Sequence, residues 1–303
     1  MNVNRISGSL LGLALGDAFG APHEGGLLER VLWALLGTKK GKRRWTDDTQ
    51  MTIDLIESLL RCGSVDQDDL ARQFAKSYRW SRGYGPGAAK ILKRIRRGQS
   101  WESAGRSVYR DGSFGNGGAM RAPAVGLFFA NDSQEELVKA ACATAAVTHA
   151  HPLGHEGAVL IALTTALAYN GTHSLSIVEQ LCQRVESPEF LGRLHKARVW
   201  LQAQDTVSPR TAAAELGNGI AALDSCVTAV YVALAFRHAS FDELLMYSIK
   251  LRGDVDTIAA MACAIWGAAR GMDALPKARL ERLEQYDRLK TLGQLFSEAV
   301  SHR

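Results

Sequence analysis

The chain has 303 residues, of which 47% are hydrophobic and 22% are charged. This composition is that of an ordinary globular protein and excludes a long disordered or collagen-like segment. The formal net charge of +5 favours anions only mildly and identifies no nucleic acid as a partner, so we expect no direct nucleic-acid binding.

The sequence carries no signal for insertion into a membrane. Asp17 interrupts the N-terminal apolar stretch, and no uninterrupted apolar run reaches the length of a bilayer span. We therefore expect a cytoplasmic protein without membrane contact, and we expect a monomer. The cysteines occur singly, without a CxxC pair, and are interpreted as buried thiols that pack in the core: Cys62, Cys142, Cys182, Cys226 and Cys263.

In chain order, the first feature is a series of glycines at every fourth position. This spacing places them on one face of a helix, where a neighbouring helix can approach closely. Glu24 is expected beyond the helix in a loop, where its carboxylate can reach a metal ion or a water molecule. The glycines are Gly8, Gly12, Gly16 and Gly20, and Asp17 follows the third.

A basic run, Lys39 to Arg44, comes next and is expected to be a solvated loop. Two alternatives remain open for it. The run could steer a polyanionic substrate toward the acidic residues that follow, or it could be a localisation signal.

The rest of the chain is dominated by helical periodicity, and strand-like alternation is almost absent. Six segments carry an apolar stripe with a period of 3.6 residues, which predicts helices packed on a core. The segments are 48–60, 70–80, 134–147, 156–169, 221–236 and 257–269. No repeat and no Pro- or Ser-rich linker divides them, so we expect an all-α fold with one domain over residues 1–303.

Two adjacent carboxylates, Asp47 and Asp48, stand directly before the first of these helices, between Thr46 and Thr49. Adjacent carboxylates repel each other unless a cation neutralises them. A capping role is the alternative, because Thr46 or Asp47 could be the N-cap and further acid would favour the helix dipole. Taken alone, this motif is explained more simply by capping.

A second acidic motif, Gly253–Thr257, changes this interpretation. Asp254 and Asp256 precede another long apolar helix, and we expect an extended loop that points both carboxylates the same way. The two motifs supply four carboxylates and two hydroxyls, and such hard oxygen donors select Mg²⁺ or Mn²⁺. Four carboxylates are too many for one magnesium ion that also keeps waters and substrate, so we expect two ions.

Glycine clusters at 83–87, 112–118 and 217–219, together with Gly253, indicate loops that approach a ligand closely. The stretch Asp111–Arg121 is interpreted as an anion-binding loop that leads into a helix, with Phe114 offering a face to a nucleobase. His149 is more simply a structural residue, but beside a phosphate site it could donate to the substrate.

These motifs, in this order, resemble the ADP-ribosylglycohydrolase family, and the likeness extends from about residue 6 to residue 275. Within the family the chain looks most similar to the serine-directed branch, on the motifs 112–121, 217–222 and 271–273. The motifs that carry the resemblance are Gly16-Asp17 with Glu24, Thr46-Asp-Asp-Thr-Gln-Met51, Arg82-Gly-Tyr-Gly85, Gly115-Asn-Gly-Gly-Ala-Met-Arg121, Thr148-His149 and Gly253-Asp-Val-Asp-Thr257.

The resemblance implies an all-α fold of the compact, orthogonal multi-helix type, with two magnesium ions at the base of a cleft. It implies that Glu24 lies on a mobile flap that touches metal or substrate. The metal ligands implied are Thr46, Asp47, Asp48, Asp254, Asp256 and Thr257. The substrate-binding residues implied are Ser113, Gly115, Asn116 and Gly117 at the diphosphate and ribose, Phe114 near adenine, His149 at the distal ribose, Tyr84 and Gly85 at the pyrophosphate, and Ile220 in the cleft.

The function implied is a magnesium-dependent ADP-ribosylhydrolase with Glu24, Asp47, Asp48 and Asp256 as catalytic residues. It would cleave the ribose C1″ bond of serine-linked ADP-ribose, O-acetyl-ADP-ribose or poly(ADP-ribose), and its partner would be an ADP-ribosylated protein or a small conjugate. Two alternatives are a hydrolase of ADP-ribosyl-arginine and a non-catalytic protein that binds ADP-ribose.

Two residues depart from the usual family pattern in the last motif. Relatives have two glycines before the first aspartate, where this chain has Arg252 and Gly253. The cation of Arg252 could compete with a metal for Asp254 or pair with an outer carboxylate. Val255 stands between the aspartates, and we expect its side chain to point away from the ions.

Overall fold

The computed structural model describes residues 3–26, 30, 31, 33, 35, 37–204 and 206–303. Its elements are almost all helices, as the periodicity predicts. The α-helices are α1 (Val3–Gly20), α3 (Asp47–Cys62), α4 (Gln67–Ser77), α5 (Pro86–Arg96), α6 (Trp101–Arg106), α7 (Ala122–Phe128), α8 (Gln134–Ala146), α9 (Pro152–Tyr169), α10 (Ser174–Arg184), α11 (Pro188–Gln202), α12 (Pro209–Leu216), α13 (Ala222–Ala235), α14 (Phe241–Leu251), α15 (Val255–Arg270), α16 (Lys277–Leu280) and α17 (Tyr286–Ser301). Short 3₁₀ helices are η1 (Ala21–His23), η2 (Trp80–Arg82), η3 (Asn116–Gly118) and η4 (Met272–Ala274).

All six predicted helices are present, with shifted ends. The segment predicted as 70–80 ends at Ser77, and Trp80 instead begins η2. The helix predicted from residue 156 begins at Pro152, because proline is well suited to the first helical position and His151 caps that end. The all-α expectation is confirmed.

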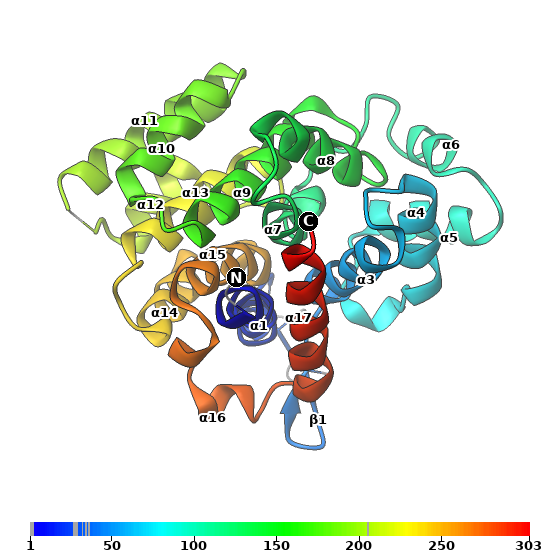
Figure 1. Cartoon of the computed structure of the whole chain (residues 1–303), viewed down its shortest axis with the longest axis horizontal. Coiled ribbons are helices and arrows are strands. Elements are labelled where there is room, and N and C mark those ends of the chain that lie inside the picture. Colours follow the sequence, from blue (N-terminus) through cyan, green and yellow to red (C-terminus); the bar gives the residue numbers. More distant parts are fainter. Residues whose placement is uncertain (1–2, 27–29, 32, 34, 36, 205) are drawn as a thin grey trace.

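Two helices form the centre of the molecule. α1 and α15 run antiparallel and are seen nearly end-on in Figure 1, with the other helices around them. A Cβ on Gly12 would lie 2.4 Å from the carbonyl oxygen of Cys263, and one on Gly16 would lie 2.3 Å from that of Ala259. The expected close approach of a neighbouring helix is therefore confirmed, and α15 is that neighbour. Because the two helices are antiparallel, the end of α1 meets the beginning of α15.

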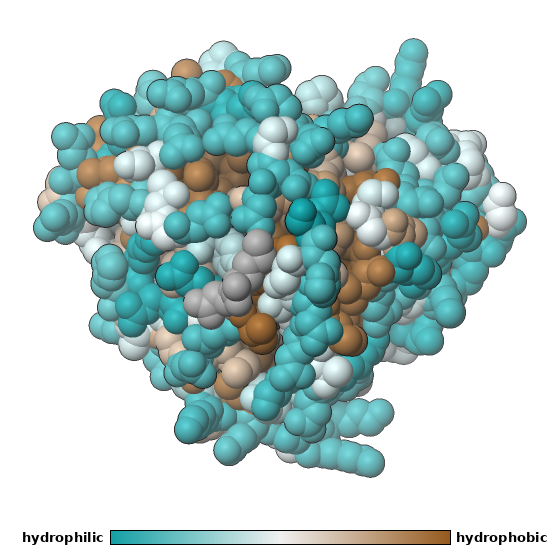
Figure 2. All heavy atoms as spheres, viewed as in Figure 1, coloured by the Kyte–Doolittle hydropathy of each residue, from teal (hydrophilic) through white to brown (hydrophobic). Residues whose placement is uncertain are grey.

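Apolar side chains from nearly every helix join one hydrophobic core that runs from Ile6 to Val300. The face drawn in Figure 2 is covered mainly by hydrophilic side chains, and hydrophobic ones show in the furrows between helices. Among the residues that the structure describes, no helix has the length and apolarity that a membrane crossing would need. The interpretation of the cysteines needs a correction, since only Cys226 and Cys263 are buried, whereas Cys62 is exposed.

The basic run forms a small antiparallel hairpin of β1 (Thr38–Lys39) and β2 (Lys42–Arg43) rather than an irregular loop. Its lysines are exposed, as expected for a solvated segment. Backbone hydrogen bonds join Arg43 to Arg282 and Glu284, so the hairpin is docked against the segment between α16 and α17. This contact holds the chain that leads into Thr46 and the first acidic motif.

Candidate functional site

The two acidic motifs meet at one end of the central helix pair. Thr46 is the N-cap of α3, and its hydroxyl accepts a hydrogen bond from the Asp48 backbone N–H at 3.3 Å. The hydroxyl of Thr257, in the first turn of α15, donates to Asp48 Oδ1 at 3.4 Å. The capping interpretation of Thr46 is therefore confirmed. Capping accounts for one oxygen of the motif, and the carboxylates of Asp47 and Asp48 remain to be explained.

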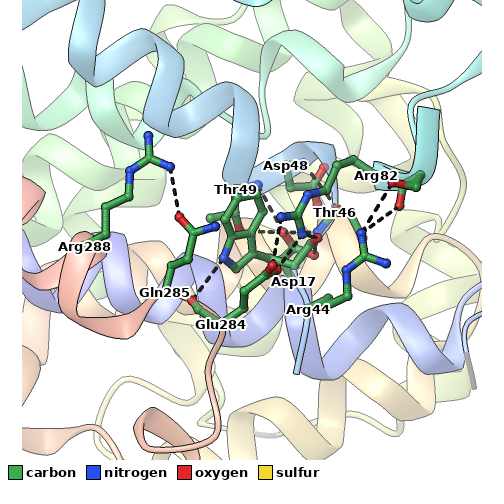
Figure 3. Close-up of polar contacts among 11 residues, drawn as sticks. Asp17, Arg44, Thr46, Asp48, Thr49, Arg82, Glu284, Gln285 and Arg288 are labelled. Carbon is green, nitrogen blue, oxygen red and sulfur yellow. Dashed lines mark hydrogen bonds and ion pairs between the residues drawn. The ribbon is translucent and has the colours of Figure 1, made fainter. Parts of the chain in front are cut away.

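Asp17, to which the sequence assigns no strong role, lies at the centre of this arrangement. Its fully buried carboxylate accepts hydrogen bonds from the backbone N–H groups of Thr46 and Thr49 and, at 2.5 Å, from the Thr49 hydroxyl (Figure 3). These bonds join α1 to the first turn of α3. The sequence does contain a signal for this role, because Asp17 is a charged residue within an apolar stretch of helix. A carboxylate buried there is costly unless hydrogen-bond donors surround it.

The second motif has a different local conformation from the predicted extended loop. Asp254 is the N-cap of α15, whereas Asp256 already lies in the first helical turn and accepts from the Thr257 backbone N–H at 2.9 Å. Val255, between them, is fully buried.

Five of the carboxylates form two groups that share Asp256. Asp17, Asp48 and Asp256 place one oxygen each within 4.8 Å of one another, and Glu24, Asp254 and Asp256 do the same. Oδ2 of Asp48 is buried without a hydrogen-bond partner. A buried, unpartnered carboxylate oxygen among acids is costly unless a cation binds it, so these residues fit a divalent metal site.

Burial and mutual repulsion disfavour the charged forms of these acids. Burial, with repulsion from Asp256, raises the pKa of Asp254 to about 8. Burial raises the pKa of Asp17 to about 6, and burial followed by repulsion from Asp256 raises the pKa values of Asp47 and Asp48 well above their usual range. Without cations the folded protein therefore holds protons at this site near neutral pH.

Glu24 follows η1 in extended backbone, as the sequence predicts. An oxygen of its half-buried carboxyl group lies within 4.8 Å of one from Asp256, and burial together with repulsion from Asp254 raises its pKa to about 7. This glutamate comes from the loop after η1, whereas Asp17, Asp48 and Asp256 lie in helices.

The carboxylates open into a cavity of about 210 Å³. Its walls include most of the predicted substrate residues: Gly85, Ser113, Gly115, Asn116, Gly117, His149 and Ile220. Glu24, Asp47, Asp48, Asp254, Asp256 and Thr257 lie in the same lining. A larger cavity of about 690 Å³, walled by Val138, Leu153, Val159 and their neighbours, holds none of the predicted residues.

Two predicted substrate residues are not brought into the cavity lining. The ring of Tyr84 packs edge-on against Tyr78, with centroids 4.9 Å apart, and is buried. Phe114 is 57% exposed and contacts the His151 ring at the outer side of the glycine loop. A nucleobase could reach Phe114 only beyond the cavity described here.

Asn116 connects the glycine loop to the acidic residues. Its side-chain amide donates to Asp254 Oδ2 and, at 3.0 Å, to the hydroxyl of Ser225, while its backbone N–H donates to the carbonyl of Ile220. These bonds draw together the loop before α7, the loop before α13 and the start of α15. The sequence offers no spacing rule that would have revealed the contact with Asp254.

A cluster of Arg82, Trp45 and Glu284 packs next to the first acidic motif. The Arg82 guanidinium pairs with Glu284 at 2.6 Å (Figure 3). It also donates to the Trp45 carbonyl at 2.7 Å and lies over the Trp45 ring. Trp45 immediately precedes Thr46, so this ion pair fixes the entry of the chain into the site.

Arg252 forms neither of the expected contacts with Asp254 or an outer carboxylate. Its side chain is exposed, and no ion pair joins it to a carboxylate within the described ranges. Its backbone instead has φ +61° and ψ −167°, a region that is almost exclusive to glycine. The usual glycine therefore fits this turn because of its backbone freedom.

Replacing Arg252 with Gly is expected to raise the free energy of unfolding by about 1 kcal/mol, because relief of backbone strain exceeds the added flexibility of the unfolded chain. Urea denaturation at fixed Mg²⁺ concentration measures the change. Arg252→Ala is the matched control, since it removes the charge but retains the strain. Equal stabilisation by Ala and Gly would assign the effect to charge and contradict the strain argument.

Comparison with known sequences decides the family. The sequence pattern of the family described as ADP-ribosylglycohydrolase matches residues 2–303. The chain belongs to the ADP-ribosylglycohydrolase family. Among relatives in this family, it is 35% identical to "ADP-ribosylhydrolase ARH3" of Mus musculus over 97% of this chain and 91% of that protein. It is 34% identical to the Homo sapiens protein of the same name, over 97% and 93%.

A solved structure titled "ADP-ribosylglycohydrolase-related protein complex" superimposes with a TM-score of 0.73 over 99% of both chains. At 24% identity this likeness supports the fold alone. Membership of the family, with the close sequence relatives, makes this chain an ADP-ribosylhydrolase-type hydrolase with ADP-ribosylated molecules as its class of substrate.

Proposed function

We propose that this protein is a magnesium-dependent ADP-ribosylhydrolase that cleaves the C1″ glycosidic bond of O-linked ADP-ribose. The substrates are serine-linked ADP-ribose, O-acetyl-ADP-ribose or poly(ADP-ribose). One observation carries the proposal: a single cavity joins the acidic ends of α3 and α15 to the backbone of a glycine loop. Such a cavity can hold a sugar at the acids and phosphates along the loop.

The oxygen donors favour two magnesium ions. Two carboxylate groups that share Asp256 are a natural arrangement for two neighbouring ions. The hydroxyl of Thr257, in the cavity lining, and that of Thr46, which caps α3 beside Asp48, are additional donors. Manganese accepts the same ligands. Bound there, the ions would neutralise the carboxylates, orient ribose oxygens and lower the pKa of a nearby water molecule.

The protein's own groups account for the remaining steps. Cleavage at C1″ develops positive charge on the ribose, which the surrounding carboxylates of Asp47 and Asp256 stabilise. Glu24 lines the same cavity and comes from the loop that follows η1. We assign Glu24 the donation of a proton to the departing oxygen of the acceptor as the C1″–O bond breaks; a water molecule then adds to C1″ and returns a proton to Glu24.

A comparison of acceptors tests this assignment. A serine oxygen needs a proton as it leaves, whereas a guanidinium already carries one. At Mg²⁺ concentrations that saturate the variant, Glu24→Gln is therefore expected to slow release from a serine-linked peptide by about a hundredfold and release from an arginine-linked peptide much less. Single-turnover rates on both peptides with Mg²⁺ measure this.

The same assay on the unmodified chain separates the candidate functions. Faster release from the serine-linked peptide supports the proposal, and faster release from the arginine-linked peptide would replace it with the arginine-directed activity. Binding of ADP-ribose in calorimetry without turnover of either peptide would indicate a non-catalytic binding protein.

A further inference from the structure

A buried arginine lies behind the glycine loop and has no role in the chemistry described so far. Arg121 is 0% exposed, and no carboxylate pairs with it among the described residues. Its guanidinium donates instead to the carbonyl of Gly117, to the carbonyl of Thr144 at 2.8 Å and to the hydroxyl of Thr148 at 3.0 Å. It also lies over the ring of Phe74. A guanidinium cannot accept a hydrogen bond, so the direction of each of these bonds is fixed.

The Thr148 hydroxyl therefore accepts from Arg121. Its second contact is Nδ1 of His149, at 2.8 Å. Thr148 is buried, and these two groups are its hydroxyl partners within the part of the chain that the structure describes. If Nδ1 carried a proton and donated to Thr148, the hydroxyl proton would be buried without an acceptor, at a cost of about 1–3 kcal/mol. The favoured arrangement is donation from Arg121 to Thr148 and from Thr148 to Nδ1.

The opposite edge of the imidazole faces the site. Nε2 lies 3.3 Å from the position that a Cβ on Gly115 would occupy and 2.9 Å from that of a Cβ on Gly117. Both glycines and His149 line the cavity that contains the carboxylates. Burial, with repulsion from the Arg121 cation, lowers the pKa of His149 to about 3, so the ring is neutral near pH 7 and has a single N–H.

We propose that Arg121 and Thr148 act as positioning residues that hold His149 in the tautomer protonated at Nε2. His149 then presents a fixed, uncharged N–H donor to the cavity. Such a donor recognises an oxygen acceptor of the ligand, a ribose hydroxyl or a phosphoryl oxygen. That the acceptor belongs to ADP-ribose rests on the proposed function, whereas the tautomer itself does not.

The tautomer is measured directly by two-dimensional ¹⁵N–¹H NMR of the histidine rings in the full chain, with His149→Asn to assign the resonances. In the unmodified protein Nδ1 of His149 is expected to resonate as an unprotonated nitrogen and Nε2 as a protonated one, between pH 6 and pH 8. A protonated Nδ1, or an imidazolium, in that range would overturn the proposal without any variant.

Thr148→Val removes the hydroxyl at nearly constant volume and is expected to give a mixture of the two tautomers, whereas Thr148→Ser keeps the relay and the Nε2 tautomer. Thr144→Val is the matched control, because the Thr144 hydroxyl is equally buried but donates to the Ala141 carbonyl in its own helix. An unchanged Nε2 tautomer in Thr148→Val, with circular dichroism showing a folded chain, would contradict the relay.

Calorimetry with ADP-ribose tests the ligand side separately. Thr148→Val is expected to weaken binding about tenfold, and Thr148→Ser and Thr144→Val to leave it unchanged. If NMR shows His149 protonated at Nε2 but ADP-ribose does not bind the unmodified protein, the proposed function is contradicted and the tautomer assignment still holds. If ADP-ribose binds equally to all four proteins, the Nε2 proton does not contact it and the recognition role is contradicted.

Discussion

Replacing Asp256 with Asn is expected to lower the turnover of an O-linked ADP-ribose substrate by about a thousandfold. Asp256 belongs to both carboxylate groups, so losing its charge would weaken both proposed cation sites and remove a group that we propose stabilises the positive ribose in the transition state. The measurement is the rate of ADP-ribose release at saturating Mg²⁺, with circular dichroism to show that the helices are retained.

Asp54→Asn is the matched control for this experiment. Asp54 is also buried and also lies on an acid-bearing helix, α3, but it bonds to Gln50 and Ser77 and is absent from the cavity lining. We expect this variant to keep its turnover. Equal loss in both variants would show that removing any buried carboxylate disturbs the fold, and retained turnover in Asp256→Asn would exclude the proposed site.

Addition of Mg²⁺ is expected to raise the melting temperature of the metal-free protein by several degrees. Binding to the folded state alone at about 100 times the Kd stabilises it by about 2.7 kcal/mol. Thermal denaturation after treatment with a chelator, with and without added Mg²⁺, measures the shift. Sodium chloride at matched ionic strength separates specific binding from general screening of the acidic residues.

The stabilisation of the folded protein by Mg²⁺ is expected to be larger at pH 8 than at pH 5.5. The folded-state pKa values are raised to about 6 for Asp17, about 7 for Glu24 and about 8 for Asp254, from ordinary values of 3.8 to 4.5. Carboxyl groups with raised pKa values stabilise the metal-free fold below their unfolded pKa, and this contribution is lost as the pH rises toward 8.

Protons also compete with Mg²⁺ for the same oxygens, so the cation binds more weakly at low pH. Because the raised pKa values mean that protons occupy these oxygens up to about pH 8, this competition widens the difference between the metal-free and Mg²⁺-bound melting temperatures as the pH rises. The variant Asp256→Asn is expected to lose most of this difference. A Mg²⁺-induced shift that is the same at both pH values and survives in Asp256→Asn would place the cations elsewhere.

Much of the fold could be predicted from the sequence because its signals are local. The apolar stripes of α3, α8, α13 and α15 follow the period of one helix and need no information about neighbours. The apolar stripes of α5, α14 and α17 follow the same period. Helix ends shifted by a few residues where capping residues, rather than apolar ones, decide them.

The chemical character of the site was also a local property. Two pairs of aspartates, each at a helix start beside a threonine, indicate hard oxygen donors wherever they lie. The glycines at every fourth position of α1 correctly indicated that a helix packs closely against it. No local pattern in the sequence, however, identifies that helix as α15.

Residue types and their spacing thus determined a helical protein with acidic helix starts, a glycine loop and a close helix pair. Only the tertiary structure decided that Asp17 binds the first turn of α3, that Asn116 reaches Asp254, and that Arg121 donates a hydrogen bond to Thr148. It also decided that Tyr84 packs in the core and that Arg252 takes a glycine-like conformation without touching an acid. These outcomes depend on distances between residues far apart in the chain, which are set by how whole helices pack and not by any interaction within a single segment.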